Sequence, residues 1–287
     1  MPRLVFFLFI GISAASTASI FIKLCDAPAL IISVYRMVFA SLILAPFAFR
    51  RKVWKGWSRS ETGWLILSGI FLSLHFAFWI ASLKYTSVAS SVVLVSTHPI
   101  FVGIGSRIFL KEPLGIKLIA GIGLSILGSA LIGFGDLSLA REAMAGDGLA
   151  LLGAITVSGY FLVGRRMRKG QDLLSYVFPV YATSALVLIL FALFWQNPFF
   201  EYKPSTYLLF LLLALIPQLI GHTTFNWALK YIPASMVAIT ILGEPVGSTL
   251  LAYFVLGEGL TLWKVLGGIL ILGGILIGIW RSPADTQ

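Results

Sequence analysis

The feature that most constrains this chain is a succession of long apolar runs, separated by charged residues, prolines and turn-forming residues. A bilayer core about 30 Å thick is crossed by a helix of about 20 apolar residues, because each residue rises about 1.5 Å. The sequence therefore predicts an all-α, polytopic membrane protein without a soluble domain. Ten transmembrane helices are expected, at residues 4–23, 29–49, 62–83, 86–109, 114–134, 147–164, 172–195, 205–228, 233–256 and 262–280.

Composition excludes the common soluble classes. Of the 287 residues, 59% are hydrophobic and 11% are charged, whereas a soluble domain is charged at about 25%. A soluble enzyme, a disordered regulator and a disulfide-stapled secreted domain are therefore excluded. The single cysteine, Cys25, cannot form an intramolecular disulfide.

The basic residues predict how the chain is oriented in the membrane. The net charge of +10 could suggest nucleic acid, but Lys and Arg occur in short clusters between apolar runs, such as 50–52 and 165–169. The more basic loops of a membrane protein lie in the cytoplasm. With the N-terminus inside, 15 of the 21 Lys and Arg are cytoplasmic, 5 lie outside and Arg36 lies within the second helix. Both termini are therefore expected in the cytoplasm, and no nucleic-acid partner is expected.

The first apolar run has two interpretations. Arg3 followed by an apolar stretch and the small residues 13–19 fits a cleaved signal peptide. Small residues also let transmembrane helices approach closely. A retained first helix is favoured, because the internal repeat requires one.

That repeat has a constant offset of 146 residues (231 − 85, for example) over a stretch without gaps. Each half, residues 1–138 and 139–287, then contains five helices, and the odd number makes the second half enter the membrane from the opposite side. Inverted repeats can exchange conformations and open a midplane site to one side and then to the other. The repeated pairs include Tyr85 and Tyr231, Pro99 and Pro245, Glu112 and Glu258, and Gly128 and Gly274.

Two motifs recur in the halves: a proline midway along the fourth and ninth helices, and Leu-x-Glu-x-Leu at residues 110–114 and 256–260. With the 5+5 pattern, they make nearly the whole chain resemble the EamA branch of the drug/metabolite transporter superfamily. The resemblance implies a secondary transporter of a bacterial-type inner (plasma) membrane, often an exporter of neutral or aromatic amino acids or related metabolites. An uncoupled facilitator of the same substrates is the alternative, and a membrane-embedded enzyme acting on lipid is less favoured.

Ionisable residues inside apolar helices are energetically costly and therefore mark candidate sites. His98 and Glu244 directly precede the repeated Pro99 and Pro245. A proline removes one backbone hydrogen bond and kinks the helix, which frees a carbonyl group toward a cavity. Both residues are expected to line a central pathway for substrate or protons, with a structural polar contact between the halves as the alternative.

A second symmetric pair is His75 on the third helix and His222 on the eighth. Residues at i+3 and i+4 share a helix face with residue i. Flat rings with polar atoms on those faces suit an amphipathic metabolite, although helix packing explains them equally well. The expected neighbours are Phe78 and Trp79 beside the first histidine, and Phe225 and Asn226 beside the second.

The remaining polar residues divide between the site and the scaffold. Tyr160 on the sixth helix and Ser13 on the first are expected near the same centre. The long side chain of Arg36 is expected to extend to the membrane interface, with binding of a substrate carboxylate as the alternative. Glu112 and Glu258 each precede an apolar helix, where a carboxylate complements the positive helix N-terminus, so a capping role is expected.

The sequence contains no phosphate-binding loop, zinc motif or nucleophile elbow. No metal or cofactor is therefore expected, and a gradient is the expected energy source, with exchange for protons left open. The expected partners are a small-molecule substrate and the lipid bilayer. Glycines at 267–268, 273–274 and 278 suit close helix contacts, within a monomer or in a homodimer.

Overall fold

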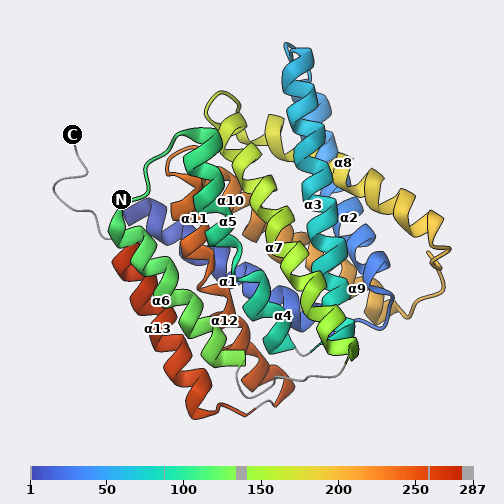
Figure 1. Ribbon diagram of the computed structural model, residues 1–287. Helices are drawn as coiled ribbons and strands as arrows, with labels where there is room; N and C mark the ends of the chain where they lie inside the picture. The colour runs from blue at the N-terminus through green and yellow to red at the C-terminus, as the bar shows by residue number, and fades with distance from the viewer. Residues whose placement is uncertain (1, 87, 134–140, 258, 280–287) are drawn as a thin grey trace.

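The computed structural model describes residues 2–86, 88–133, 141–257 and 259–279, and within these ranges it is helical with no strand. Eight of the described helices are long and apolar enough to cross a membrane, so the protein is a polytopic all-α membrane protein (Figure 1). Two further apolar helices, His98–Leu110 and Ile116–Ile132, are shorter. The expected boundary between the halves, at residues 138 and 139, lies outside the described residues.

The first part of the chain has three long helices, then a divided helix and a further one. The long helices are α1 (Pro2–Leu24), α2 (Ala29–Arg51) and α3 (Arg59–Tyr85). The divided helix consists of α4 (Val88–Val95), α5 (His98–Gly105) and the π-helical turn η1 (Ser106–Leu110). It is followed by α6 (Ile116–Gly133).

The second part follows the same order. It begins with α7 (Arg141–Arg168) and α8 (Leu173–Phe194). Its third segment consists of α9 (Pro204–Leu213), the π-helical η3 (Ala214–His222) and α10 (Thr223–Ala228). Its divided segment consists of α11 (Ala234–Ile241), α12 (Glu244–Leu251) and η4 (Ala252–Leu256), and α13 (Leu262–Ile279) ends the described chain.

The two divided helices break at equivalent places. Pro99 and Pro245 lie in the first turns of α5 and α12, where a proline is tolerated because the N–H it lacks would have no intrahelical partner. The interruptions fall just before, at residues 96–97 and 242–243. His98 and Glu244 are consequently the first residues of their half-helices.

Helices α6 and α13 form a close antiparallel contact built on glycine. A Cβ added to Gly121 would lie 2.4 Å from the carbonyl oxygen of Gly274, and one added to Gly128 would lie 2.5 Å from that of Gly267. The pairing is antiparallel because the higher number on α6 meets the lower number on α13. Gly267 and Gly274 are also the repeat equivalents of Gly121 and Gly128. The repeat therefore converts the contact of Gly121 with Gly274 into the contact of Gly267 with Gly128, as a two-fold axis requires.

Side-chain hydrogen bonds and ion pairs join the connecting segments at each of the two ends of the molecule. At the first, Arg165 Nη1 donates to the carbonyl of Leu229 (2.6 Å), and Gln171 Nε2 donates to Glu61 Oε1 (3.4 Å). We call this the basic end; it carries the connections 52–58, 111–115, 169–172 and 229–233.

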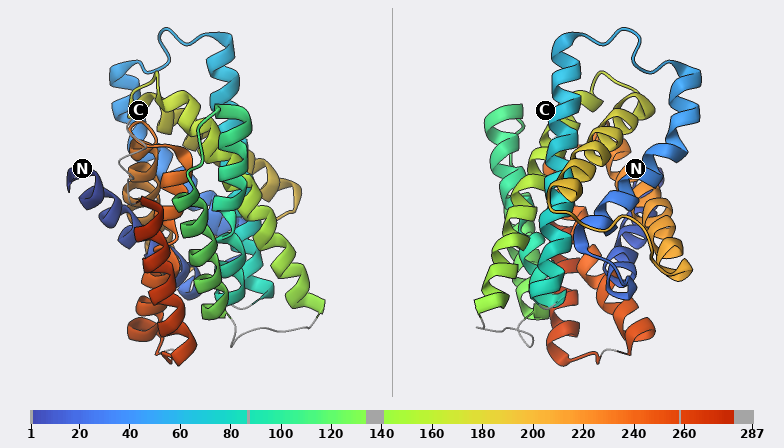
Figure 2. Two further views of the ribbon diagram at one scale, coloured as in Figure 1. Left: turned by 60° about the vertical axis from the view of Figure 1, so that its left-hand side comes forward. Right: turned by 90° about the vertical axis from the view of Figure 1, so that its right-hand side faces the viewer.

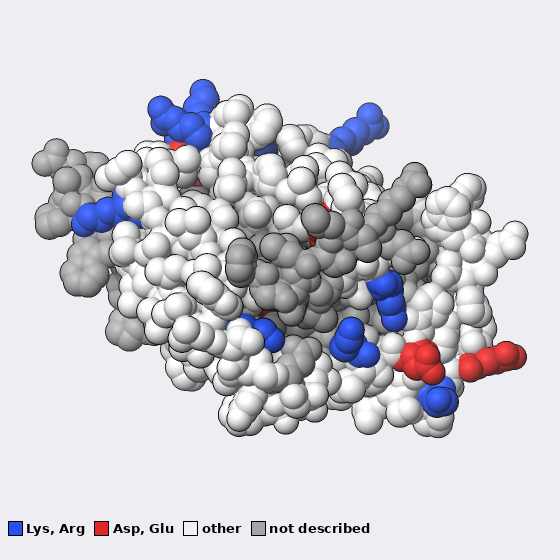
Figure 3. Space-filling view, turned by 60° about the horizontal axis from the view of Figure 1, so that its bottom comes forward, with Lys and Arg blue, Asp and Glu red and all other residues white. Residues whose placement is uncertain are grey.

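At the other end, called the opposite end, Lys203 pairs with Asp26 (3.7 Å) and Tyr35 donates to the carbonyl of Phe199 (2.7 Å). Figure 2 shows the α2–α3 connection at the basic end, and the end of η4 and the start of α13 at the opposite end. Figure 3 brings the opposite end forward, and its visible Lys and Arg side chains are scattered among uncharged atoms.

Candidate functional site

A central cavity of about 50 Å³ lies among segments from both parts of the chain. A water needs about 10–15 Å³ of such space, so the cavity admits a few waters and has to widen to take a metabolite. It is lined by eight residues that the sequence singles out: Arg36, His75, Trp79, His98, His222, Phe225, Glu244 and Pro245. Their segments are far apart in the chain, so the fold brings them together at one place.

Two serines fix the breaks in the divided helices. Ser158 Oγ, on α7, lies 3.1 Å from the carbonyl oxygen of His98, and Ser16 Oγ, on α1, lies 3.3 Å from that of Glu244. Since His98 and Glu244 are repeat equivalents, the two hydrogen bonds are equivalent as well. The start of each half-helix is therefore held by the first helix of the other part of the chain.

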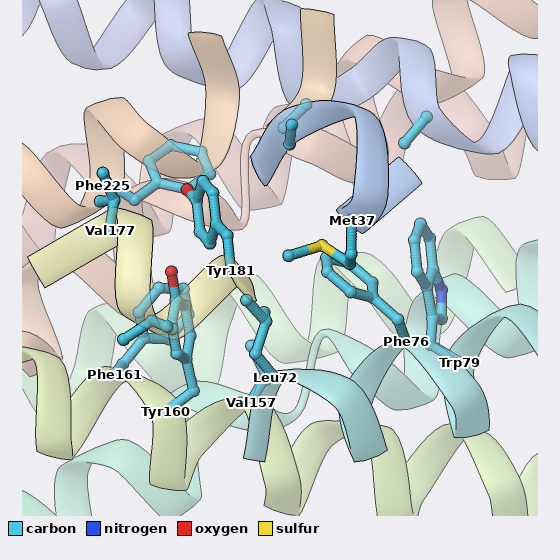
Figure 4. Packing of buried hydrophobic residues seen from close by; sticks show 14 of the residues in the cluster. Met37, Leu72, Phe76, Trp79, Val157, Tyr160, Phe161, Val177, Tyr181 and Phe225 are labelled. Atoms are coloured by element: carbon cyan, nitrogen blue, oxygen red, sulfur yellow. The ribbon is translucent and has the colours of Figure 1, made fainter. Parts of the chain in front are cut away.

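The histidine pair forms an aromatic wall. His75 Nδ1 lies 3.0 Å from the carbonyl oxygen of Gly153, so this nitrogen carries the hydrogen and donates. The ring of His75 is parallel to that of Trp79 (4°, centroids 5.9 Å apart) and lies 6.4 Å from that of His222. Phe76 lies 5.4 Å from His222 and adds a ring that the sequence reading did not include. Figure 4 shows Phe76 and Trp79 side by side on α3.

Arg36 does not extend to the membrane interface, and that expectation is wrong. The side chain is fully buried (0% exposed) and lines the cavity. Its Nε donates to Gln218 Oε1 (2.9 Å), and its guanidinium carbon lies 4.1 Å from the centre of the Phe76 ring. The reason is a buried partner: Gln218 on η3 offers an acceptor inside the bundle, so the guanidinium does not have to reach water to be solvated.

Asn226 and Tyr160 lie behind the wall rather than in it. Asn226 Nδ2 donates to the hydroxyl of Tyr160 (2.5 Å) and to the carbonyl of His222 (2.9 Å). Neither residue lines the cavity. Both are fully buried, and they tie α7 to the segment that carries His222.

Phe78 and Ser13 were expected in the site and lie elsewhere. Phe78 borders an apolar groove between α2, α3 and α8, and Ser13 is exposed on α1. Helix geometry gives the reason. At about 100° per residue, Trp79 is about 40° from His75 whereas Phe78 is about 60° to its other side, and Ser13 is about 200° from the cavity-lining Ala15.

Several buried polar atoms at the cavity have no hydrogen-bond partner within the described part of the chain. Buried polar groups are normally satisfied, so a cluster of unpaired polar atoms marks a surface prepared for a polar ligand or water. The atoms are Arg36 Nη1, Trp79 Nε1, His98 Nε2 and His222 Nδ1.

Glu112 stabilises the fold, but by an ion pair and not by the expected helix cap. Its Oε1 accepts from Arg165 Nε (2.7 Å) and lies 3.5 Å from Lys169 Nζ, and α6 begins only at Ile116. The basic cluster at the end of α7 provides partners nearer than the helix N-terminus. Glu258, for which the same capping role was expected, lies outside the described residues.

The sequence did not point to Gln218 or Phe76, and it gave an inward Arg36 that binds a carboxylate only as the alternative. One signal could have found Arg36: Val34-Tyr35 recurs as Val180-Tyr181 at the offset of 146, which places Ala182 opposite Arg36. A charge that appears in only one copy of a repeat is not needed by the shared scaffold.

The fold and this cavity define a class: polytopic membrane proteins in which broken helices surround a polar site near the middle of the bundle. Comparison with known proteins identifies the family within this class. The model of the EamA-like transporter family matches twice, at residues 3–134 and 144–280, so the chain belongs to this family.

Individual relatives agree with this membership. An "Uncharacterized transporter" of Archaeoglobus fulgidus is 25% identical over 93% of this chain and 92% of its own length. Mouse "Solute carrier family 35 member G1" is 27% identical over 89% of this chain and 72% of its own length. A crystal structure superposes with a TM-score of 0.82 over 100% of both chains at 18% identity, a likeness of fold alone. The family and the names of its members indicate a membrane transporter.

Proposed function

We propose that this protein is a gradient-driven secondary transporter of an inner (plasma) membrane that exports small amphipathic metabolites, such as neutral or aromatic amino acids, by alternating access. Its ten membrane segments form a 5+5 inverted repeat, residues 1–138 and 139–287, with both termini in the cytoplasm. The observation that carries the proposal is the central cavity, where His98 and Glu244 from equivalent breaks face one site.

The antiparallel contact between α6 and α13 supports the inverted repeat. Equivalent helices of two inverted halves run in opposite directions, and the reciprocal glycine contacts are what an axis in the membrane plane produces. The clustering of basic connections at one end supports the cytoplasmic placement of that end. An uncoupled facilitator of the same substrates is the second candidate, because the cavity geometry is compatible with transport with or without protons.

Counterflow in proteoliposomes tests the proposal. Vesicles loaded with unlabelled phenylalanine, leucine or alanine should take up the labelled amino acid unchanged, and an imposed pH gradient should drive accumulation. Failure of every amino acid to enter would contradict the proposed substrates, and chemical conversion of the label would indicate an enzyme. Uptake without any response to the pH gradient would favour the facilitator.

The variant Glu244→Gln separates coupling from folding. We expect it to abolish proton-driven accumulation while the purified protein stays folded and monodisperse. The control Glu201→Gln changes an exposed glutamate away from the cavity and should transport as the unchanged protein does. Normal coupling in Glu244→Gln would assign that carboxylate a structural role.

A further inference from the structure

We propose that the central cavity binds the head group of a zwitterionic α-amino acid, with Arg36 holding its carboxylate and Glu244 its ammonium group. This inference rests on the proposed transport function and specifies the chemistry that the site recognises. Four observations carry it.

The first is the half-satisfied guanidinium of Arg36. Gln218 occupies Nε, and Phe76 covers one face of the plane, which together fix the orientation of the group. Nη1 is buried and has no partner within the described part of the chain. A buried cation without a counter-ion is strongly unfavourable, and the fork of a guanidinium matches a carboxylate in two parallel hydrogen bonds.

The second is Glu244, which lines the same cavity from α12. Its backbone is held by Ser16 and Pro245 follows it, so its position is fixed by the break in the helix. Among the described residues its carboxylate makes no hydrogen bond and no ion pair within 4 Å; Arg36 acts on it electrostatically but without direct contact. The cavity therefore presents two opposite charges that act on each other electrostatically but are not joined by a direct ion pair.

The third is the departure from the repeat. The offset of 146 places Ala182 opposite Arg36 and His98 opposite Glu244. The serines, prolines and glycines of the scaffold recur in both parts of the chain, but these two charges do not. The site is thus electrically asymmetric within a symmetric frame, as a ligand with a positive and a negative end requires.

The fourth is the balance of charge between a ligand and the cavity, together with the aromatic residues of the cavity wall. A zwitterion pairs both buried charges, whereas an anion leaves Glu244 unpaired and a cation leaves Arg36 unpaired, each at a desolvation cost. The rest of the lining includes Trp79, Phe161 and Phe225. These rings suit an apolar or aromatic side chain attached to the charged head group.

Binding to the purified full-length protein in nanodiscs tests the inference with three ligands of one shape. Phenylalanine carries both charges, 2-phenylethylamine lacks the carboxylate and 3-phenylpropanoate lacks the ammonium group. One charged hydrogen-bonded contact changes affinity by about ten- to hundredfold, so phenylalanine should bind the unchanged protein at least about tenfold more tightly than either analogue. The leucine series, with 3-methylbutylamine and 4-methylpentanoate, repeats the comparison.

Two variants assign the charges. Arg36→Gln should remove the preference for phenylalanine over 2-phenylethylamine and leave its preference over 3-phenylpropanoate. Glu244→Gln should do the reverse. The controls Arg107→Gln and Glu201→Gln alter exposed residues and should leave both preferences unchanged. If Arg36→Gln does not fold, Arg36→Lys replaces it and should weaken both carboxylate ligands while binding of 2-phenylethylamine is unchanged.

Three results would overturn the inference: an analogue that binds the unchanged protein as tightly as its parent zwitterion, no binding of either amino acid, or variants that weaken all three ligands equally. These results are distinct from a failure of transport. Counterflow of a non-zwitterionic solute would overturn the head-group site and leave the transport function standing. Charge-specific binding without any counterflow would overturn the transport function alone.

Discussion

The basic end and the opposite end use equivalent positions in different ways. At the basic end, Arg165 joins Glu112, which precedes α6, to the carbonyl of Leu229 at the end of α10, and Lys169 lies beside the same carboxylate. The side chains of Arg165 and Glu112 are only 11% and 9% exposed. Three segments are therefore clasped together between the central cavity and this end.

The equivalents at the opposite end border open space. The two serines that hold the half-helices, Ser16 and Ser158, relate α1 to α7 at an offset of 142 residues, which makes Lys23 the equivalent of Arg165. Leu83 is the equivalent of Leu229 at the offset of 146. Lys23 and Leu83 line a second cavity of about 250 Å³.

This difference between the two ends indicates how one scaffold can support two arrangements, one closed by side-chain contacts and one open. The helices, their breaks and their glycine contacts recur in both parts of the chain, whereas the clasp is formed at one end and a cavity lies at its equivalent. Two similar halves can exchange such arrangements at a modest free-energy difference. We expect the exchanged arrangement, with the clasp opened, to be the second state of the transport cycle.

Breaking the clasp should have the largest effect on stability. Glu112→Ala leaves the mostly buried Arg165 without its carboxylate, and we expect the free energy of unfolding to fall by about 3 kcal/mol. Thermal unfolding of the purified protein measures it. Glu201→Ala, at an exposed glutamate, should stay within about 0.5 kcal/mol. Equal effects of the two variants would show that the clasp does not hold the basic end.

The second largest effect on stability is expected at the glycine contact between α6 and α13, which recurs toward both ends. Gly128→Ala places a methyl group 2.5 Å from the backbone oxygen of Gly267, so α6 and α13 must separate, at a cost of about 1–3 kcal/mol. Gly123→Ala is the matched control, since nothing lies within 4 Å of its added Cβ on the same helix. The control should be neutral or slightly stabilising, because alanine favours a helix. A control as unstable as Gly128→Ala would contradict the packing.

The serines that hold the two half-helices, Ser16 and Ser158, should have the smallest effect and the most symmetric one. Ser16→Ala and Ser158→Ala each remove a hydroxyl that bonds to a carbonyl of its own helix and also to the first carbonyl of a half-helix, and each should destabilise by about 1 kcal/mol. Ser41→Ala is the control, because its hydroxyl bonds only within its own helix, to the carbonyl of Met37. Clearly unequal effects of Ser16→Ala and Ser158→Ala would show that the two breaks are not supported equivalently.

The sequence was sufficient to predict the features that follow from apolar length and from the internal repeat. Apolar length gives the helices, and the repeated prolines give the positions of the breaks, because a proline has few acceptable places in a helix. The residues His98 and Glu244 could be singled out for the same reason. Their common cavity follows from the fold.

The direction of a long side chain could not be predicted from the sequence. Arg36 turns inward because Gln218 offers an acceptor, and Gln218 lies on a π-helical segment whose wider turn changes which residues face the bundle. The prediction for Phe78 was wrong for a related reason. The i+3 and i+4 neighbours of a helical residue point about 100° apart, and a narrow cavity admits only one of them. Such details depend on which helices become neighbours.

The most direct test of two inverted halves around one cavity compares the reactivities of Leu83→Cys and Leu229→Cys, each made in a chain with Cys25→Ser. A membrane-impermeant methanethiosulfonate applied in nanodiscs reaches both ends. We expect Leu83→Cys to react faster than Leu229→Cys, and adding Glu112→Gln to accelerate Leu229→Cys while slowing Leu83→Cys. Changes in the same direction at both positions, or no change at either, would contradict the exchange of arrangements between the halves.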